Sequence, residues 1–235
     1  KMTKTEATRS DFNYDVLAIG AHPDDVEHMI GGTLLRLRDQ GKRICIAHMT
    51  HGEAGTHGSA ALRDEEARAA AAYLGADVYW LDFPDTKIEN TVEARLKMVR
   101  FIREIRPRLI LCHYYHYPLM HPDHEATGEI VRSAFRLSRF KNVETGNEPF
   151  WIPNIVYYLF PETVRASFVV DVTDYMDRWE KLARCYASQL EGISRYYERL
   201  ITRKRAAGLL IDVPFGEAFY CDRPLNATLT DLTTL

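Results

Sequence analysis

Two short motifs in this sequence place a histidine, a proline and further polar side chains in the same order. The segment His22–Asp25 reads His-Pro-Asp-Asp, and the segment His121–His124 reads His-Pro-Asp-His. Proline is favoured at the first position of a helix, acidic residues are favoured in its first turn, and the residue before a proline is extended. Each motif therefore predicts a histidine at the end of a strand and further metal-binding groups on the opening turn of a helix.

These side chains have the composition of a catalytic metal site. Together the motifs supply three histidines and three aspartates. Two histidines and one carboxylate can hold a zinc ion that keeps one position for water, and zinc lowers the pKa of that water to about 7. A second carboxylate can take the proton of the water, and a further acid can orient a histidine. One such motif alone would indicate helix capping beside surface histidines, whereas two matched motifs favour the metal site.

The elements around the motifs alternate between strands and helices. Apolar runs predict strands at residues 16–20, 44–47, 78–81 and 109–112, and amphipathic patterns predict helices at 26–37, 62–74, 92–105 and 125–137. This alternation is typical of parallel strands joined by right-handed crossovers. We therefore expect an α/β fold, a Rossmann-like doubly wound and mostly parallel sheet, with strand order 3-2-1-4-5 in the first part of a single domain.

The expected strand order brings the two motifs to one place. Strands 1 and 4 are neighbours at the switch point of such a sheet, where open α/β folds bind ligands. The exits of strands 2 and 3 add the segments Thr50–Glu53 and Asp82–Asp85 to the same edge. The sequence thus predicts one polar site at the carboxyl ends of the strands.

The remainder of the chain continues the domain. Strands are expected at 155–160 and 168–172, helices at 175–188 and 194–207, and a long surface loop at 141–153. The polar segment 1–13 is expected to be a disordered N-terminal tail, followed by one domain over residues 14–235.

Composition and motif content exclude several classes of protein. The formal net charge of −3 argues against a general nucleic-acid binder, and no apolar stretch is long enough to span a membrane. The turn after the first strand, Gly20–Asp25, lacks the glycine pattern of a dinucleotide site. The four cysteines form no CxxC pair, and the polar N-terminus does not read as a secretory signal. A reducing compartment and a cytoplasmic location are therefore expected.

The two motifs and their context resemble the LmbE-like, or PIG-L-like, zinc de-N-acetylases. The likeness extends from about Tyr14 to Tyr220. It includes the segments Gly31–Thr33, Thr50–Thr56, Leu62–Glu66, Ser188–Gln189 and Gly216–Phe219. The branch that the sequence is most similar to contains the N-acetylglucosaminyl-malate deacetylases of bacillithiol biosynthesis. The resemblance implies a hydrolase that removes an acetyl group from an N-acetylglucosamine-type conjugate and often forms homo-oligomers.

The resemblance also implies a role for each motif residue. His22, Asp25 and His124 match the metal ligands of the family, for Zn²⁺ or another divalent metal such as Fe²⁺. Asp24 matches the general base. His121 matches the histidine that stabilises the oxyanion or protonates the leaving amine, and Asp123 would orient it. Amide hydrolysis independently requires an activated water, a polarised carbonyl and a proton for nitrogen.

Further residues are candidates for contacts with the substrate, each with a structural alternative. Arg63 matches a family residue that contacts sugar hydroxyls, or it is an exposed helix arginine paired with Glu66. Glu53 and Asp85 could bind sugar hydroxyls, or they form turns.

The loop before the second motif adds two more candidates and one departure from the family pattern. Tyr115 or Tyr117 could polarise the carbonyl, or both pack within the loop.

Three other histidines, His48, His51 and His57, are expected to have no role in the site. Met120 stands where the bacillithiol branch often has an arginine, which weakens the expectation of a malate-bearing substrate.

Two other readings remain open from the residues alone. A non-haem iron oxygenase also uses two histidines and one carboxylate, although Asp24 beside Asp25 argues against it. A metal-binding module without catalysis is the second alternative. The leading expectation is a metal-dependent amidohydrolase acting on a small N-acetylated amino sugar, with neither nucleic acid nor membrane as a partner.

Overall fold

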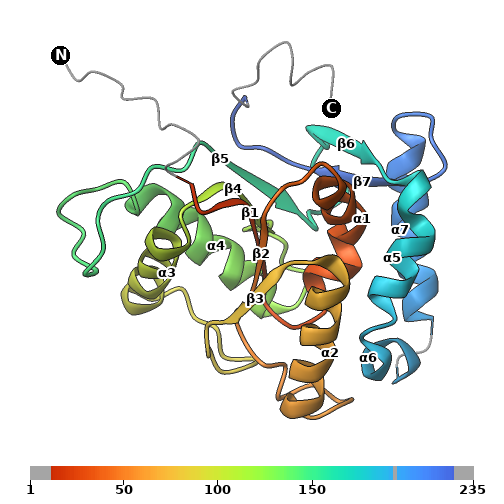
Figure 1. The fold of residues 1–235 in the computed structure, drawn as a ribbon, viewed down its shortest axis with the longest axis horizontal. Coiled ribbons are helices and arrows are strands. Elements are labelled where there is room, and N and C mark those ends of the chain that lie inside the picture. The colour runs from red at the N-terminus through yellow and green to blue at the C-terminus, as the bar shows by residue number, and fades with distance from the viewer. Residues whose placement is uncertain (1–11, 193–194, 225–235) are drawn as a thin grey trace.

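A five-stranded parallel sheet forms the centre of the molecule (Figure 1). The computed structural model describes residues 12–192 and 195–224. The strands are β1 (Tyr14–Gly20), β2 (Ile44–His48), β3 (Asp77–Trp80), β4 (Pro107–His113) and β5 (Asn154–Tyr158), in the order β3-β2-β1-β4-β5. The predicted order 3-2-1-4-5 is confirmed.

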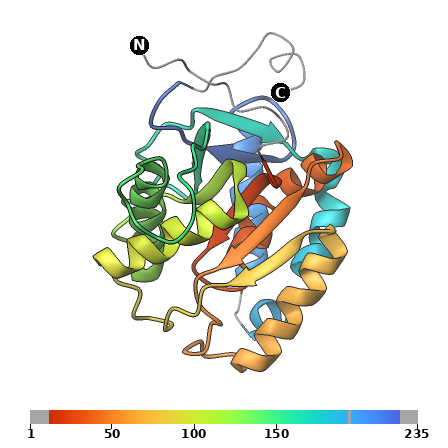
Figure 2. The same cartoon turned by 60° about the vertical axis from the view of Figure 1, so that its left-hand side comes forward.

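Helices cover both faces of this sheet (Figures 1 and 2). On one face lie α3 (Val92–Ile105) and α4 (Pro122–Leu137); on the other lie α1 (Asp25–Asp39), α2 (Ala60–Leu74), α5 (Met176–Ala183) and α7 (Tyr196–Leu209). The last of these falls close to its predicted range, of which Ser194 lies outside the described residues. Within the described part of the chain, no helix is both long and apolar enough to cross a bilayer.

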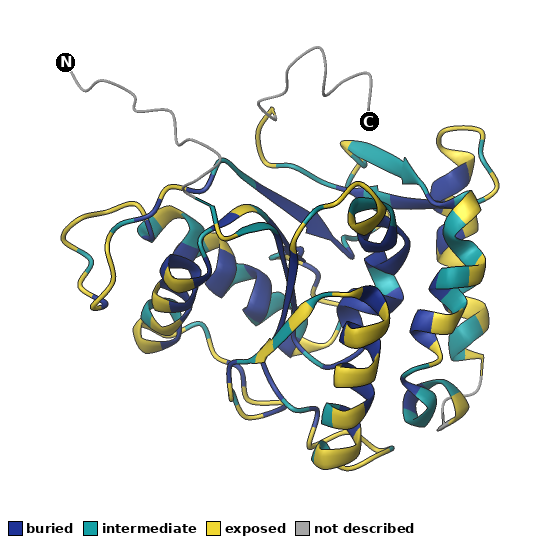
Figure 3. Ribbon diagram, viewed as in Figure 1, coloured by how far each residue is buried: buried dark blue, intermediate teal, exposed yellow. Residues whose placement is uncertain are grey.

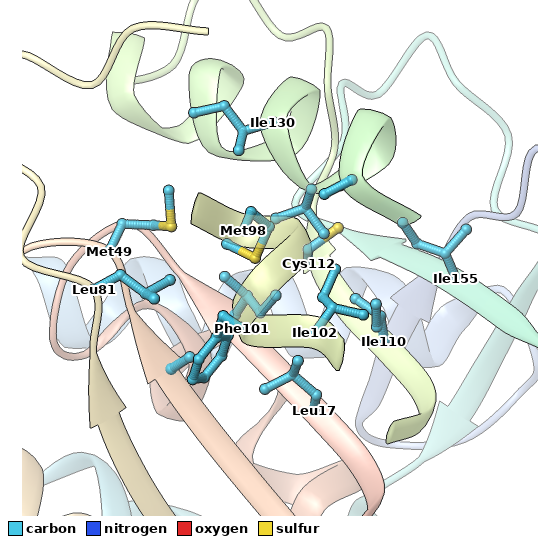
Figure 4. Close-up of a cluster of buried hydrophobic side chains, with 14 of the residues drawn as sticks. Leu17, Met49, Leu81, Met98, Phe101, Ile102, Ile110, Cys112, Ile130 and Ile155 are labelled. Atoms are coloured by element: carbon cyan, nitrogen blue, oxygen red, sulfur yellow. The ribbon is translucent and has the colours of Figure 1, made fainter. Parts of the chain in front are cut away.

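The core consists of two layers separated by the sheet. Successive residues of β1 alternate between them: Leu17 and Ile19 pack with α3 and α4, whereas Val16 and Ala18 pack with α1 and α2. Figure 4 shows the first layer, in which Met98, Phe101 and Ile102 of α3 belong to the same buried cluster as Leu17 of β1. Both layers are buried, as the dark strands in Figure 3 indicate, and this explains the continuous apolar runs of the strands.

The second half of the chain departs from the prediction in two ways. β6 (Phe168–Asp171) and β7 (Gly216–Phe219) form a separate antiparallel pair, and β7 was not predicted as a strand. The helix expected at 175–188 is not continuous: after a 3₁₀ turn (Thr173–Tyr175) the chain forms α5 within the predicted range and then a separate helix, α6 (Ala187–Gly192). The break directs the fully buried Tyr186 towards α1, where its hydroxyl donates to Glu27 at 2.8 Å.

One buried arginine, Arg103, holds the long loop predicted at 141–153. Arg103 of α3 has 3% of its surface exposed. Its guanidinium donates five hydrogen bonds, to the carbonyls of Ser138, Phe140, Val143 and Asn147 and to the hydroxyl of Thr145. The loop is therefore held in place by a buried group of α3 rather than by secondary structure of its own.

The N-terminal boundary is only partly covered by the described residues. Residues 1–11 of the expected tail lie outside them. Phe12 packs edge-on against Phe150, with ring centroids 5.8 Å apart, and the Asn13 amide donates to the carbonyl of Arg106. The expected division into a tail and one domain stays a prediction.

Candidate active site

The two His-Pro-Asp motifs meet at the carboxyl ends of β1 and β4. These strands are direct neighbours in the sheet, and each motif follows its strand at the same edge. The ring centroids of His22 and His121 are 4.8 Å apart, and those of His22 and His124 are 5.3 Å apart. The structure thus brings together the side chains that the sequence analysis selected.

Asp25 lies between the two histidines of the expected ligand set. Its Oδ1 is 3.1 Å from Nε2 of His124, and its Oδ2 is 3.5 Å from Nδ1 of His22. The other ring nitrogen of His22, Nε2, is 3.1 Å from Asp85 and 3.4 Å from Asp123. A metal-binding histidine commonly uses one nitrogen for the metal and donates from the other to a carboxylate, which matches this arrangement.

These residues fit a divalent cation. Two imidazole nitrogens and a carboxylate converge, with their possible ligand atoms within 4.8 Å of one another. The electrostatics also favour positive charge here: burial opposes protonation of His22, but Asp123, Asp25 and Asp85 outweigh it and hold the pKa of His22 well above its usual value. The site therefore stabilises a cation, and the donor set is one that zinc or ferrous iron accepts.

The surroundings of Asp25 lower the pKa of its carboxyl group. Burial alone would raise its pKa, but the imidazoles of His124 and His113 hold it well below its usual value. Its Oδ2 also accepts the backbone amide of His22 at 2.8 Å, which closes a tight turn between β1 and α1. This turn corrects one expectation: Pro23 does not begin α1, whereas Pro122 does begin α4.

Asp24 occupies the position before α1 with a strained backbone. Its φ of 109° and ψ of −31° lie where residues other than glycine are rarely found. The side chain is buried, and its Oδ2 lies 3.4 Å from Nη2 of Arg63. Burial raises the pKa of Asp24, and Arg63 acts against that rise. A carboxyl group adjacent to the candidate ligand Asp25 is therefore held in a fixed position beside the site.

Arg63 is buried rather than exposed on α2. It donates to the carbonyls of Pro23 and Gly52, at 2.5 and 3.2 Å. Gly52 has a φ of +68°, and a Cβ there would come within 2.2 Å of the Arg63 guanidinium, so only glycine fits. Of the two alternatives for Arg63, the exposed helix arginine paired with Glu66 is wrong, because Arg63 is buried and Glu66 accepts hydrogen bonds from Ser188 instead. The contact of Arg63 with sugar hydroxyls stays a prediction.

His121 is the exposed member of the site. It precedes the first residue of α4, and its Nδ1 accepts the backbone amide of Asp123 at 3.3 Å. Burial and the neighbouring His22 lower its pKa. The Asp123 carboxylate is directed elsewhere: it accepts the backbone amides of Thr86 and Ile88 and approaches His22. Orientation of His121 by this carboxylate therefore stays a prediction, and the observed contact uses the backbone.

The predicted substrate contacts lie around the cluster, but most are engaged within the protein. The Glu53 carboxylate accepts the amides of His51 and Asp85, at 3.2 and 2.8 Å. Asp85 accepts the amide of Ala54 and contacts His22. The hydroxyl of Tyr115 donates to Asp222 at 2.7 Å. The structure thus places Glu53 in a turn and Asp85 behind a ligand histidine, while their contacts with substrate stay predictions.

His113 was missed by the sequence analysis. It is the last residue of β4 and is fully buried. Its Nε2 lies 3.1 Å from Oδ2 of Asp25, and its ring stacks on His124 with centroids 4.2 Å apart. Its place at the end of a strand beside the switch point was the available signal. His113 thus supports two of the three candidate ligands.

Helix α1 is interrupted in its middle, and a buried ion pair lies beside the break. Ile30 has non-helical backbone angles, which free the amides of Gly32 and Thr33. Both amides donate to the carboxylate of Glu217 in β7, at 3.0 and 2.7 Å. Lys204 of α7 binds Glu217 and also donates to the carbonyl of Met29. Side chains from the end of the chain therefore replace the missing helical hydrogen bonds.

Comparison with known proteins is consistent with this geometry. The profile of the PIG-L family, described as GlcNAc-PI de-N-acetylase, matches residues 17–135, which include both motifs. The solved structure of N,N'-diacetylchitobiose deacetylase from Pyrococcus horikoshii is similar, with a TM-score of 0.80 and 30% identity. The match covers 92% of this chain and 88% of that one.

Three curated relatives cover most of the chain. Diacetylchitobiose deacetylase of Thermococcus kodakarensis is 30% identical over 83% of this chain and 81% of its own length. A Bacillus anthracis protein named probable N-acetyl-alpha-D-glucosaminyl L-malate deacetylase 2 is 26% identical over 80% of this chain and 88% of its own. A Pseudomonas putida protein named 4-oxalmesaconate hydratase is 24% identical over 80% and 78%, respectively.

Proposed function

This chain belongs to the PIG-L family of GlcNAc-PI de-N-acetylases, and we propose that it hydrolyses the N-acetyl group of an amino-sugar conjugate with zinc held by His22, Asp25 and His124. The observation that carries the proposal is the arrangement of Asp24 beside these residues. It is a buried carboxylate that the ligand set does not use, held next to Arg63 on a strained backbone.

In this proposal each side chain has a separate task. A divalent cation at the three ligands supplies polarisation of a carbonyl and acidification of water. Asp24 takes the proton of the attacking water, while the buried Arg63 keeps Asp24 in place. His121, whose side chain is exposed to solvent, gives a proton to the departing nitrogen, so that acetate and a free amine result. Asp85 and Asp123 hold the orientation of His22.

The alternatives are less well supported. An oxygenase has no use for a carboxylate base beside the ligands, and three of the four proteins compared above are named deacetylases. The relative named as a hydratase raises a second kind of water chemistry, which releases no acetate. Our proposal is therefore tested directly by the product formed.

The finer identity of the substrate also belongs to the proposal. N-acetylglucosaminyl-malate, and with it bacillithiol biosynthesis, is one candidate, because a relative bears the name of that activity. Met120 has an uncharged side chain that lies partly buried against the apolar core. It therefore offers no charge to a malate carboxylate. We also propose a cytoplasmic location and a homo-oligomer, as expected from the sequence.

The decisive experiment measures acetate and free amine released from a panel of N-acetylglucosaminides by the zinc-loaded protein. Equal amounts of acetate and amine are expected, with both lost after chelation and restored by zinc. The variant Asp24→Asn is the matched control, because it changes the base and leaves the three ligands in place. Absence of acetate from every N-acetylated sugar tested would overturn the proposal.

A further inference from the structure

His51, a histidine that was expected to have no role in the site, links three elements at the edge of the sheet where the site lies. It follows β2, and its ring stacks on that of Trp80 at the end of β3, with centroids 5.9 Å apart and planes 3° apart. Its Nδ1 lies 2.8 Å from Oδ1 of Asp64 in α2. Its Nε2 lies 2.9 Å from Oδ1 of Asp82 in the loop after β3. The ring therefore joins the loop after β2 to α2 and to the loop after β3.

The two carboxylates favour the protonated form of His51. Partial burial lowers the pKa of His51, but Asp82 and Asp64 outweigh this effect and raise the pKa above its usual value. In the protonated ring both nitrogens donate, and each has a carboxylate as its acceptor. The side chain of Asp64 is 23% exposed, whereas that of Asp82 is 73% exposed. Asp64 is therefore the stronger partner, since ion pairs in solvent contribute little.

The contact with Asp64 is one of two successive contacts between the loop after β2 and α2. The next residue of the loop, Gly52, accepts a hydrogen bond at its carbonyl from the guanidinium of Arg63, at 3.2 Å. Residues 51 and 52 of the loop thus bind residues 64 and 63 of the helix. These paired contacts hold the loop against the beginning of α2.

The same loop holds Asp85 against a candidate ligand. The Glu53 carboxylate accepts the backbone amide of Asp85 at 2.8 Å, and the amide of Ala54 donates to Oδ2 of Asp85 at 2.9 Å. The other oxygen of that carboxylate, Oδ1, lies 3.1 Å from Nε2 of His22. The position of the loop therefore determines the position of the Asp85 carboxylate and the orientation of the His22 ring.

We propose that His51 is a positioning residue of the metal site: through Asp64 it holds the loop after β2 against α2, and this loop holds Asp85 at His22. The proposal rests on the proposed function in one respect, namely the use of His22 as a metal ligand. His51 acts through its neighbours, so its loss should loosen the site and leave the ligands themselves present.

The test measures the zinc dissociation constant by competition with a chromophoric chelator, which does not depend on turnover. His51→Leu removes the donor and should raise the constant by about three- to tenfold, less than the loss of a direct partner of a ligating histidine. His51→Asn keeps an N–H donor near the position of Nδ1 and should bind zinc as the wild type does. Asp64→Ala should resemble His51→Leu. The control is Asp82→Ala, which removes the largely exposed partner and should bind zinc as the wild type does.

A second background separates positioning from a general loss of structure. If His51 acts through Asp85, His51→Leu should have little further effect in a protein that already carries Asp85→Ala, because the supported contact is absent there. An unchanged constant in His51→Leu would overturn the proposal. An equal increase in both backgrounds would also overturn it, since the effect would then not pass through Asp85.

The outcomes distinguish this proposal from the proposed function. Zinc affinity that depends on His51, in a protein that releases no acetate from any N-acetylated sugar, would support the positioning role and overturn the deacetylase. Acetate release by a zinc-loaded protein whose zinc affinity is the same in His51→Leu would support the deacetylase and overturn the positioning role.

Discussion

Nε2 of His22 lies 3.1 Å from Oδ1 of Asp85, and this contact determines which nitrogen of His22 faces the other ligands. With Nε2 committed to Asp85, Nδ1 remains for a cation shared with Asp25. Asp85 is held in turn by the backbone amide of Ala54 at 2.9 Å. The loops after β2 and β3 thereby fix the ring orientation of His22, a candidate ligand that follows β1.

Loss of this contact should weaken metal binding. We expect Asp85→Ala to raise the zinc dissociation constant by about 10- to 100-fold, the usual cost of removing a partner of a ligating histidine. Competition with a chromophoric chelator measures the constant. Asp82→Ala, which removes a largely exposed carboxylate from the same loop, is the control. Equal affinity of the Asp85 and Asp82 variants would contradict the role given to Asp85.

Removal of a ligand should have a stronger effect. His124→Ala leaves Asp25 with one fewer imidazole at 3.1 Å, so the protein should be isolated with little zinc and without activity. Elemental analysis after loading with zinc and desalting gives the metal content per chain. Stoichiometric zinc in His124→Ala would exclude this ligand set.

The candidate base should affect turnover and not metal content. Asp24→Asn keeps the shape of the side chain but removes its ability to accept a proton. We expect kcat to fall by about 10²- to 10⁴-fold while zinc is retained. The measurement pairs steady-state kinetics with the zinc content of the same sample, and a near-normal kcat in a zinc-replete variant would remove Asp24 from the mechanism.

His121 should act mainly in the transition state. His121→Ala is expected to retain zinc, to lower kcat and kcat/KM by similar factors, and to leave KM close to that of the wild type. The wild type and the variant are compared over the same range of substrate concentrations. A raised KM with unchanged kcat would assign His121 to substrate binding alone.

The loop at residues 141–153 should depend on Arg103 for stability. Arg103→Lys replaces a guanidinium that makes five hydrogen bonds by an ammonium with three donors. We expect the free energy of unfolding to fall by about 2–4 kcal/mol, because one buried and three partly buried carbonyls lose their donor. Urea denaturation measures the change, with Arg100→Lys as the control, since Arg100 makes one such contact, to Thr145. Identical midpoints for the two variants would show that the guanidinium fork is dispensable.

The order of the sheet was predictable because its signals are local. Apolar runs such as 16–20 alternate with helical patterns, and the handedness of the crossovers then leaves few arrangements. The juxtaposition of His22 and His124 follows from that order alone, since β1 and β4 are neighbours. The same order predicted a polar site at this edge, whereas the assignment of His22, Asp25 and His124 as metal ligands rests on the family resemblance and stays a prediction.

Features that depend on distant partners were not predictable. The sequence of α2 does not show that Arg63 is buried, because the carbonyls of Pro23 and Gly52 reach its guanidinium only in the folded chain. The helix expected at 175–188 is broken near Tyr186, whose hydroxyl donates to Glu27, a residue that is far away in the sequence. His113 carries no motif, and its contact with Asp25 exists only after β4 has paired with β1.

The ion pair beside the break in α1 makes the hydrogen bonding of this helix depend on residues that are synthesised much later in the chain. The ligand Asp25 emerges early from the ribosome, but the amides of Gly32 and Thr33 in the same helix find their acceptor only when Glu217 has been added. A nascent chain that lacks Lys204 and Glu217 contains all three candidate ligands, but these two amides of α1 lack the acceptor that they have in the folded protein. Closing contacts between segments so distant in sequence is slow relative to helix formation. The hydrogen bonding of α1 is therefore completed only after β7 has been synthesised.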